Sequence, residues 1–543
     1  MSLRFSYGAP NSQSLIKDGT LHLHGVDRAV LKNIDACKGL SDVTTSSYGP
    51  NGMNKIVINH LDKLFVTNDS ATIVKELEIA HPAARMIVQA AQMQEKEVGD
   101  GTNFVIVFAG ELLKQAENLI KTGLHPVEII DGYTKALEKA IEILDELVVE
   151  NIEKMTNEEL VAKAIQASIA SKQYGNEEFL SKLVAKACIQ ILPSNQKNFN
   201  VDNIRVSKIV GGSVYDSNVV KGFIAQRKPE SSVTHVENAK VVVYSCGVEA
   251  GDTETKGNTV FESAQQMLNY NQTEEDSLEA KIKFLHDAGV KVIVSENNIS
   301  EMAVHFIEKY GLMAIKIPSK FDIQRLCKAI KATALVRFDP PTQEELGFCS
   351  EVKVQEIAGT TITVFSQSEK QKSLLSTIII RGSTKNILDN IERGIDDGVN
   401  SFKALCKNGK LLYGGGATEV QMARIIQKYG EESPGLNQYS IRKFGEALEI
   451  VPRKISDNSG MKSNEIISNL YAEHEKGNKS FGVDILNETV GDMKEKAIYD
   501  LYSTRYWGLK FAVDAVTTIL RVDQIIMSRP ENGPKLPQQT RDY

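Results

Sequence analysis

Apolar positions recur at helical spacing through the first third of the chain. This spacing predicts helices over residues 27–48, 81–97, 103–150, 156–170 and 176–192, the third of them broken at Gly123-Leu124-His125-Pro126. Two alternating segments, 55–59 and 63–67, predict a hairpin that turns at His60-Leu61-Asp62, and a further helix is expected to begin near Ala71. We therefore expect this part of the chain to be mainly helical.

From Ile204 the pattern changes to short apolar strands that alternate with amphipathic helices. Strands are predicted over 204–210, 240–244, 291–294, 313–317 and 377–382, and helices over 275–288, 299–310 and 322–332. This alternation is typical of an α/β domain with parallel strands. Segment 247–275 is polar and poor in strand signals, so it is interpreted as a solvent-exposed protrusion, although an ordinary long loop fits the same pattern.

The remainder of the chain returns to a helical pattern. Helices are expected over 384–406 and 418–430, and Phe481-Gly482-Val483-Asp484 interrupts the pattern that follows. The order α, α/β, α predicts one helical domain that is split, with the α/β domain inserted in its middle. Residues 1 to about 25, and those after Met527, are expected to be loosely ordered.

Composition excludes several classes of protein. The net charge of −7 argues against nucleic acid or an anionic membrane as the main partner, and no apolar run is long enough to span a membrane. No secretory signal is expected behind Met1, and the six scattered cysteines fit the reduced thiols of a cytosolic protein. His22 and His24 alternate on a short expected strand without further ligands, which favours surface residues over a metal site.

The strongest candidate for chemistry is the turn Val98-Gly99-Asp100-Gly101-Thr102-Asn103. Its glycines let a ligand approach the backbone, and Thr102 and Asn103 open a helix whose free N–H groups attract a phosphate. Asp100 would repel that phosphate unless a magnesium ion lay between them, because Mg²⁺ binds both carboxylate and phosphate oxygens. Taken alone, the motif is at least as typical of an N-capped helix–turn–helix.

Two further aspartates accompany the turn. Asp69 lies in Asn68-Asp69-Ser70-Ala71-Thr72, which is interpreted as a second helix start suited to a phosphate, and Asp397 precedes the glycines Gly414-Gly415-Gly416. Singly, each aspartate is typical of a helix cap or a solvated surface residue. The order of all these motifs along the chain, together with Tyr48-Gly49-Pro50-Asn51-Gly52, is far more specific. An unrelated P-loop ATPase is disfavoured because no G-x-x-x-x-G-K-[ST] run occurs.

In these motifs, and over nearly its whole length, the chain resembles the group II chaperonins, the family of the archaeal thermosome and the eukaryotic cytosolic chaperonin TRiC/CCT. Stretches that resemble one particular subunit type of the eukaryotic complex are Pro318-Ser319-Lys320-Phe321-Asp322, Arg325-Leu326-Cys327, Asp396-Asp397-Gly398-Val399-Asn400, Tyr506-Trp507 and Arg521–Met527. The resemblance implies a multi-domain α and α/β chaperonin fold. Its expected parts are a split equatorial domain (1–148 and 406–543), a hinge-like intermediate domain (149–218 and 373–405) and an inserted α/β apical domain (219–372) whose protrusion, at about 247–275, forms a lid.

The resemblance also implies a function. The chain is expected to be an ATP-hydrolysing subunit of a cytoplasmic, hetero-oligomeric double ring of eight subunits per ring, in which hydrolysis drives lid closure over non-native clients, actin- and tubulin-like proteins among them. No nucleic acid or membrane partner is expected. By position, Asp100 matches the ligand of Mg²⁺, and Asp69 and Asp397 match the carboxylates at the attacking water. The other implied nucleotide-binding residues are Tyr48, Gly49, Gly101, Thr102, Asn103, Ser171, Lys172, Gly415, Asp500 and Arg505.

Four positions depart from the family's common residues. They are Ser70, Asn103, Asp396 and Gly398, and each could slow hydrolysis without preventing nucleotide binding. The alternative function is therefore a mainly structural ring subunit that holds nucleotide and clients but hydrolyses ATP weakly.

A client-binding surface is implied on the helix predicted over 322–332. Its apolar stripe, which begins at Phe321, is interrupted by polar residues, and the resemblance places clients against Gln324, Lys328 and Lys331. An ordinary core-packed helix with a charged outer face fits the sequence equally well.

Overall fold

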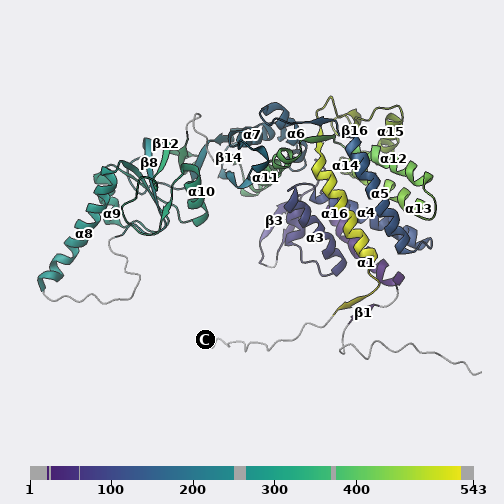
Figure 1. Ribbon diagram of the computed structural model, residues 1–543, viewed down its shortest axis with the longest axis horizontal. Helices are drawn as coiled ribbons and strands as arrows, with labels where there is room; N and C mark the ends of the chain where they lie inside the picture. The colour runs from purple at the N-terminus through teal and green to yellow at the C-terminus, as the bar shows by residue number, and fades with distance from the viewer. Residues whose placement is uncertain (1–20, 24–25, 60, 250–263, 368–374, 528–543) are drawn as a thin grey trace, which may run out of the picture.

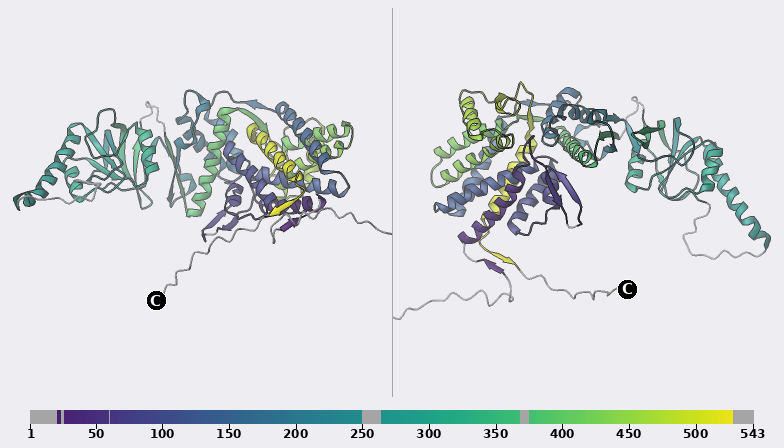
Figure 2. Two further views of the ribbon diagram at one scale, coloured as in Figure 1. Left: turned by 60° about the horizontal axis from the view of Figure 1, so that its bottom comes forward. Right: turned by 180° about the vertical axis from the view of Figure 1, so that it is seen from behind.

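The computed structural model describes residues 21–23, 26–59, 61–249, 264–367 and 375–527, and the expectations for the two termini fall largely outside these ranges. The described residues form a row of three parts: a large helical part, a small middle part and a sheet-containing part at the far end (Figures 1 and 2). The mixture of helical and α/β parts that the sequence predicts is confirmed. The exact domain boundaries stay predictions.

Both ends of the chain build the helical part. One hydrophobic core joins α1 (Val26–Thr45), α3 (Pro82–Glu97), α4 (Thr102–Lys121) and α5 (Pro126–Glu146) to α12 (Ala417–Glu432), α13 (Asn437–Leu448), α14 (Ile450–Asn458), α15 (Ser463–Glu475) and α16 (Tyr502–Leu520). At its centre Phe108 of α4 meets Phe444 of α13 edge to face, with ring centroids 5.6 Å apart. Helices that the sequence separates by some three hundred residues therefore share one interior, as the split-domain prediction requires.

Short strands tie this part together. β1 (Leu21–Leu23), which contains His22, pairs with β19 (Ile525–Met527), so the short strand expected near the N-terminus is confirmed. β2 (Lys55–Ile58) and β3 (Leu64–Thr67) form the predicted hairpin ahead of α2 (Ser70–Glu76). Further pairs are β4 (Glu150–Asn151) with β15 (Lys410–Tyr413), β15 with β18 (Tyr499–Leu501), and β16 (Phe481–Asp484) with β17 (Thr489–Asp492).

The middle part is also made from two distant segments. β5 (Ile204–Val210) pairs in parallel with β14 (Ser376–Gly382), and β6 (Asn218–Val220) completes the sheet. The helices α6 (Glu158–Ala170), α7 (Glu177–Gln190) and α11 (Lys385–Lys407) share its core, where Phe199 and Phe402 meet with centroids 4.9 Å apart. This core is separate from that of the helical part, although α11 reaches the boundary between them.

The third part contains a mixed sheet of seven strands. β8 (His235–Tyr244), β9 (Val290–Ser295), β10 (Met313–Lys316) and β11 (Ala334–Leu335) are parallel, whereas β12 (Gly347–Ile357), β13 (Thr360–Ser366) and β7 (Gly222–Ala225) are antiparallel. The expectation of parallel strands is therefore wrong for three of the six strand pairings in this sheet. β12 was missed because polar residues interrupt its apolar positions, and β13 because its buried stretch, residues 362–365, is short and contains a threonine. They turn at Ala358 and Gly359, both in the left-handed region.

The helices of this part correct another prediction. α8 spans Ala264–Asp287, so the helix expected to begin at 275 begins eleven residues earlier, and the C-terminal part of the polar segment 247–275 is helical. Residues 250–263 lie outside the described ranges. The early turns were missed because their apolar residues are few among many polar ones, which gives only a weak helical period. The C-terminal half of α8 packs against the sheet beside α9 (Glu301–Lys309), and its N-terminal half extends beyond the sheet at the end of the molecule (Figure 1). α10 (Lys320–Ile330) also packs against the sheet. Within the described ranges, no helix is long and apolar enough to cross a membrane.

Candidate functional site

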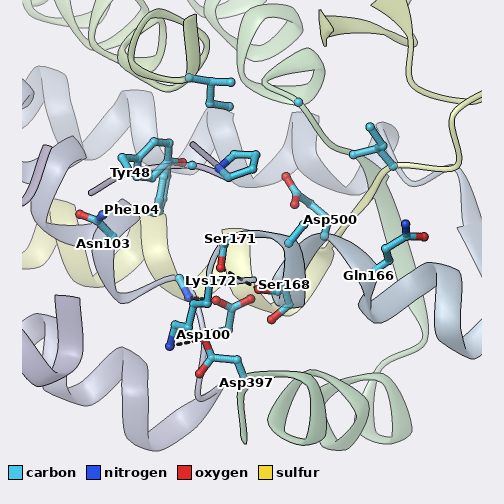
Figure 3. Close-up of a pocket in the computed structure, with 18 of the residues that line it drawn as sticks. Tyr48, Asp100, Asn103, Phe104, Gln166, Ser168, Ser171, Lys172, Asp397 and Asp500 are labelled. Carbon is cyan, nitrogen blue, oxygen red and sulfur yellow. Dashed lines mark hydrogen bonds and ion pairs between the residues drawn. The ribbon is translucent and has the colours of Figure 1, made fainter. Parts of the chain in front are cut away.

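A cavity of about 560 Å³ lies where the helical part meets the middle part, a volume typical of small-molecule sites. It is lined by every residue predicted to be catalytic or nucleotide-binding: Tyr48, Gly49, Asp69, Asp100, Gly101, Thr102, Asn103, Ser171, Lys172, Asp397, Gly415, Asp500 and Arg505. Figure 3 shows some of them, Tyr48, Lys172 and Asp500 among them. The three residues predicted to contact clients, Gln324, Lys328 and Lys331, lie elsewhere, on or just after α10.

The glycine turn between α3 and α4 is held in a conformation that other residues rarely adopt. Gly99 and Gly101 have φ angles of 77° and 79°, and a Cβ atom on Gly101 would lie 2.6 Å from Thr504 Cγ2. The buried Gln94 fixes the turn, because its Nε2 donates to the carbonyl oxygens of Asp100 (2.8 Å) and Thr504 (3.2 Å). The turn therefore brings its backbone close to the cavity in one defined shape.

The first turn of α4 offers backbone donors to the cavity. Its N-cap is Gly101, which makes no side-chain cap hydrogen bond. The first N–H groups of a helix have no intrahelical partner, and they carry the positive end of the helix dipole. An anion at Thr102 and Asn103 would meet both features, as the sequence predicts.

The second predicted phosphate-binding helix start is wrong. Asp69 caps α2 itself, since its carboxylate accepts hydrogen bonds from the amides of Ala71 (3.3 Å) and Thr72 (3.1 Å) and from the Thr72 hydroxyl (2.6 Å). The donors that a phosphate would need are therefore occupied. Asp69 is thus a helix cap that also lines the cavity.

Lys172 joins two of the predicted aspartates. Its Nζ lies 3.0 Å from Asp69 Oδ1 and forms an ion pair with Asp397 Oδ2, and each of the three side chains is at most 12% exposed. Figure 3 shows Lys172 and Asp397 together. Burial alone would raise the pKa of Asp69, but Lys172 and the donors of Thr72 outweigh it and lower the pKa to about 2. Burial raises the pKa of Asp397 well above its usual range, and Lys172 offsets this only in part. Burial would lower the pKa of Lys172, but the two carboxylates raise it, so this lysine stays charged.

Two more carboxylates line the same end of the cavity. Asp100 lies beside Lys172 in Figure 3, and its Oδ1 accepts a hydrogen bond from the Gly101 amide at 2.7 Å. Glu95, which the sequence reasoning missed, accepts a 2.8 Å hydrogen bond from the Thr102 hydroxyl, and burial raises its pKa. This end of the cavity therefore holds four carboxylates, those of Asp69, Glu95, Asp100 and Asp397, and one lysine, Lys172. Because the carboxylates outnumber the lysine, an added cation would be stabilised there.

The donor set fits magnesium bound together with a phosphate. The described residues include no cluster of three or more side chains that would form a complete metal centre. Mg²⁺ usually takes only one or two protein carboxylates and completes its shell with water and phosphate oxygens, so Asp100 is sufficient for this mode of binding.

The opposite end of the cavity holds a second charged group. Arg505 Nη2 lies 2.5 Å from Asp500 Oδ2, and Arg505 Nε lies 2.9 Å from Glu419 Oε1. Arg505, predicted to bind nucleotide, lines the cavity and forms ion pairs with these two carboxylates. Nearby, the Asn458 amide donates to the carbonyl oxygen of Tyr48 (2.7 Å), which fixes the loop before Gly49.

The remaining predicted residues lie on the walls between the two ends. Gly415 has a φ of 63°, and a Cβ atom there would lie 2.7 Å from Met493 Sδ, so the position requires glycine. Ser171 follows α6, its hydroxyl donates to the Ser168 carbonyl (2.7 Å), and its own carbonyl accepts from Asn68 Nδ2 (3.2 Å). This last bond joins the middle part to the helical part at the cavity.

The glycine turn also touches the helix that carries Asp397. A Cβ atom on Gly99 would lie 2.3 Å from Asn400 Cγ, and Asn400 follows Asp397 by one turn of α11. We expect Gly99→Ala to displace α11 and reduce hydrolysis at least tenfold, because the left-handed φ adds strain of about 1–2 kcal/mol to the collision. ATP turnover by the assembled complex, with the other subunits inactivated, measures the effect. A matched Gly99→Ala, Asn400→Gly double variant should recover part of the loss; no recovery would mean that the collision is not the cause.

Comparison with known proteins identifies the family. The profile of the TCP-1/cpn60 chaperonin family matches residues 40–530. T-complex protein 1 subunit theta of Gallus gallus is 50% identical over 537 residues, which cover 98% of each chain, and the Homo sapiens protein of that name is 49% identical with the same coverage. The Arabidopsis thaliana protein is 48% identical over 525 residues, which cover 96% of this chain and 95% of its own. The chain therefore belongs to the TCP-1/cpn60 chaperonin family, and within it to the theta subunits of T-complex protein 1.

Proposed function

We propose that this chaperonin subunit binds and hydrolyses Mg-ATP in the cavity between its helical and middle parts. The supporting observation is that Asp69, Asp100, Asp397 and Lys172 meet beside the uncapped N-terminus of α4. Phosphoryl transfer to water needs the phosphate held, its charge neutralised and the water oriented. This one group of residues supplies each of these functions.

In this proposal each residue of the site has its own role. The amides at the start of α4 and the charged Lys172 would hold the phosphates, and Asp100 would hold magnesium, which neutralises charge on the phosphate oxygens. Asp397 would accept the proton of the attacking water, because a carboxylate whose pKa is raised is the stronger base. Asp69 is fixed by its cap hydrogen bonds and would keep Lys172, and through it Asp397, in place.

A subunit that hydrolyses ATP weakly is the second candidate. Two departures from the family's common residues leave buried polar atoms beside the cavity without a hydrogen-bond partner among the described residues, Ser70 Oγ and Asn103 Oδ1. Asn103 Nδ2 donates instead to the Thr44 carbonyl at 3.4 Å. Such atoms favour binding water or ligand over a tightly organised catalytic site, which is the observation that supports this candidate.

We further propose that the subunit works in a cytoplasmic double ring of eight subunits per ring. In this proposal, ATP hydrolysis closes the ring's lid over non-native clients, actin- and tubulin-like proteins among them. The family and the theta-subunit relatives support the proposal. The mass of the native complex tests it, since a particle of about sixteen subunits is expected and a monomer would contradict it.

Metal binding gives a direct test of the site. We expect Asp100→Ala to weaken magnesium-dependent nucleotide binding at least tenfold, because the turn holds no other acidic side chain. Asp69→Asn is the matched variant, since asparagine caps a helix as well as aspartate does while the charge is removed. It should slow turnover and leave nucleotide affinity within about threefold of wild type. Titration of each variant with Mg-ADP separates the two roles; wild-type affinity in Asp100→Ala would reject the assignment.

The client surface is proposed on α10. Its inner face packs into the core of the sheet through Ile323, Leu326 and Ile330, whereas Gln324, Lys328 and Lys331 are exposed. Phe321, predicted from its pattern to belong to the apolar stripe, is 71% exposed and adds an apolar contact to this outer face.

A crosslinking experiment tests this surface. A photoreactive residue at Gln324 or Lys328 should crosslink to a trapped non-native client, because mixed polar and apolar faces bind unfolded chains. The matched control is Glu301, which opens α9 in the same part of the molecule. Equal labelling from Glu301, or labelling confined to α8, would contradict the proposal.

A further inference from the structure

One exposed aromatic side chain on the wall of the cavity has no part in the chemistry above. Tyr174 lies in the loop between α6 and α7, two residues after Lys172. It lines the cavity and keeps 40% of its surface exposed. An exposed tyrosine is ordinary on an open surface, but on the wall of a cavity it offers a flat, mostly apolar face to a ligand.

Tyr174 lies near the wall that β16 forms. Burial raises the pKa of Tyr174, and the charges of Glu177 and Asp484 raise it further, so its hydroxyl lies within electrostatic reach of both carboxylates. Asp484 is the last residue of β16, and the carbonyl oxygen of Val483 before it would lie 3.4 Å from a Cβ atom on Gly415. The loop between α6 and α7 therefore reaches from the buried lysine and its aspartates to the wall on the helical part.

The turn after β16 is apolar and is held in one shape. Its Leu486 lines the cavity with 78% of its surface exposed, and Ile485 lines the cavity as well. Asp484 fixes the turn, because its Oδ1 accepts a hydrogen bond from the Leu486 amide (3.1 Å) and its Oδ2 accepts one from the Asn487 side chain (2.7 Å). Tyr174 from the middle part and Leu486 from the helical part thus border the same cavity.

A flat base suits this stretch of the cavity better than a phosphate does. Lys496 also lines the cavity, but it is paired with Asp484 and so is not free to bind a phosphate. The start of α4 and Lys172 attract the phosphates elsewhere in the cavity. An aromatic side chain stacks on any nucleobase, because every base has a flat π-face, and aliphatic side chains pack against the opposite face.

We propose that Tyr174 is a specificity-determining residue that stacks on the base of the bound nucleotide and holds the base against the turn at Leu486. The inference rests on the proposed nucleotide binding. Because Tyr174 belongs to the middle part and Leu486 to the helical part, the base then joins these two parts of the molecule. The proposal predicts that Tyr174 acts on the base and leaves the binding of the phosphates unchanged.

Competition for photolabelling tests the proposal in the assembled complex. The subunit is labelled in the presence of magnesium with radioactive ATP that carries a photoreactive benzoylbenzoyl group on its ribose, and is then resolved by mass. The competitors are ATP and inorganic tripolyphosphate, which has the phosphates but no base. In the wild type, ATP should compete at a lower concentration than tripolyphosphate. Tyr174→Ala should reduce the ratio of these two concentrations about tenfold, because stacking on the base is lost.

The ratio separates base stacking from a structural role. Tyr174→Phe keeps the ring and should keep most of the wild-type ratio, and so should Tyr439→Ala, which removes a tyrosine that is 49% exposed on α13 outside the cavity. If Tyr174→Ala does not assemble, Leu486→Ala should lower the ratio from the opposite wall.

Two results would overturn the inference. One is a wild-type ratio in both Tyr174→Ala and Leu486→Ala. The other is an equal loss of ATP and tripolyphosphate binding in Tyr174→Ala, which would mean that the substitution disturbs the phosphate end through Lys172. Failure of the wild-type subunit to be labelled at all would instead refute the proposed nucleotide site.

Discussion

Replacing Asp397 with alanine should leave ATP bound to this subunit but unhydrolysed. Binding uses Asp100 and the start of α4, which the substitution does not touch, whereas proton transfer from water is lost in the transition state alone. Removal of a positioned general base typically lowers a rate by about 10²–10⁴-fold. The measurement is the nucleotide found at this position, resolved for each subunit after a chase, because the other subunits would mask the loss in the turnover of the whole ring.

The control for this variant is Asn386→Ala. Asn386 lies in the first turn of the same helix and is exposed, whereas Asp397 is buried with 4% of its surface exposed. Asn386→Ala should hydrolyse its nucleotide at the wild-type rate. Finding ADP in Asp397→Ala at that same rate would show that Asp397 is not the water-positioning group. If the wild-type subunit hydrolysed ATP equally slowly, the alternative function, a subunit that hydrolyses ATP only weakly, would be favoured.

Removing the charge of Lys172 should have the largest effect on stability. Lys172→Met leaves Asp69 and Asp397 buried without their shared cation, and breaking a buried ion pair in this way costs about 3–5 kcal/mol. The rate of ATP hydrolysis should fall as well, because Asp397 loses the ion pair that holds it in place. Denaturant unfolding of the purified full-length chain measures the loss of stability.

The loss of stability in Lys172→Met should depend on pH, and the direction of this dependence follows from the pKa of Asp397. Burial raises the pKa of Asp397, so in Lys172→Met the folded chain binds a proton there more tightly than the unfolded chain does. The free-energy cost of burying the charged Asp397 carboxylate is then present above its pKa in the folded chain. This cost is relieved as pH falls through that pKa. The stability difference between Lys172→Met and wild type should therefore shrink between pH 8 and pH 5. A Lys172→Met, Asp397→Asn double variant should lose most of this pH dependence; a deficit that grows on acidification would contradict the ion-pair account.

The sequence predicts the lining of the cavity better than it predicts the role of each residue. Asp69, Asp100 and Asp397 were brought together by the order of their motifs and by the family resemblance, not by periodicity, which gives no information across three hundred residues. Periodicity also cannot separate a cap from a catalytic group. Asp69 is a helix cap that also lines the cavity, and Arg505, predicted as a ligand contact, forms ion pairs with two carboxylates.

Glu95 and Glu419 were missed for a related reason. Both lie on helices beside the glycine motifs, where a glutamate is ordinarily solvated, and only tertiary packing buries them. The fold errors have the same origin. The first turns of α8 hold few apolar residues among many polar ones, and β12 mixes polar and apolar residues without strict alternation, so the local pattern gives a weak signal at these elements.

A cryo-electron microscopy map of the assembled complex with ATP and magnesium tests the central claim most directly. The account predicts nucleotide density in the cavity of this subunit, with the phosphates at the start of α4, a magnesium ion at Asp100, and Lys172 with Asp397 at the γ-phosphate. An empty cavity in this subunit while its neighbours are occupied, or a nucleotide whose phosphates lie away from Asp100, would contradict it.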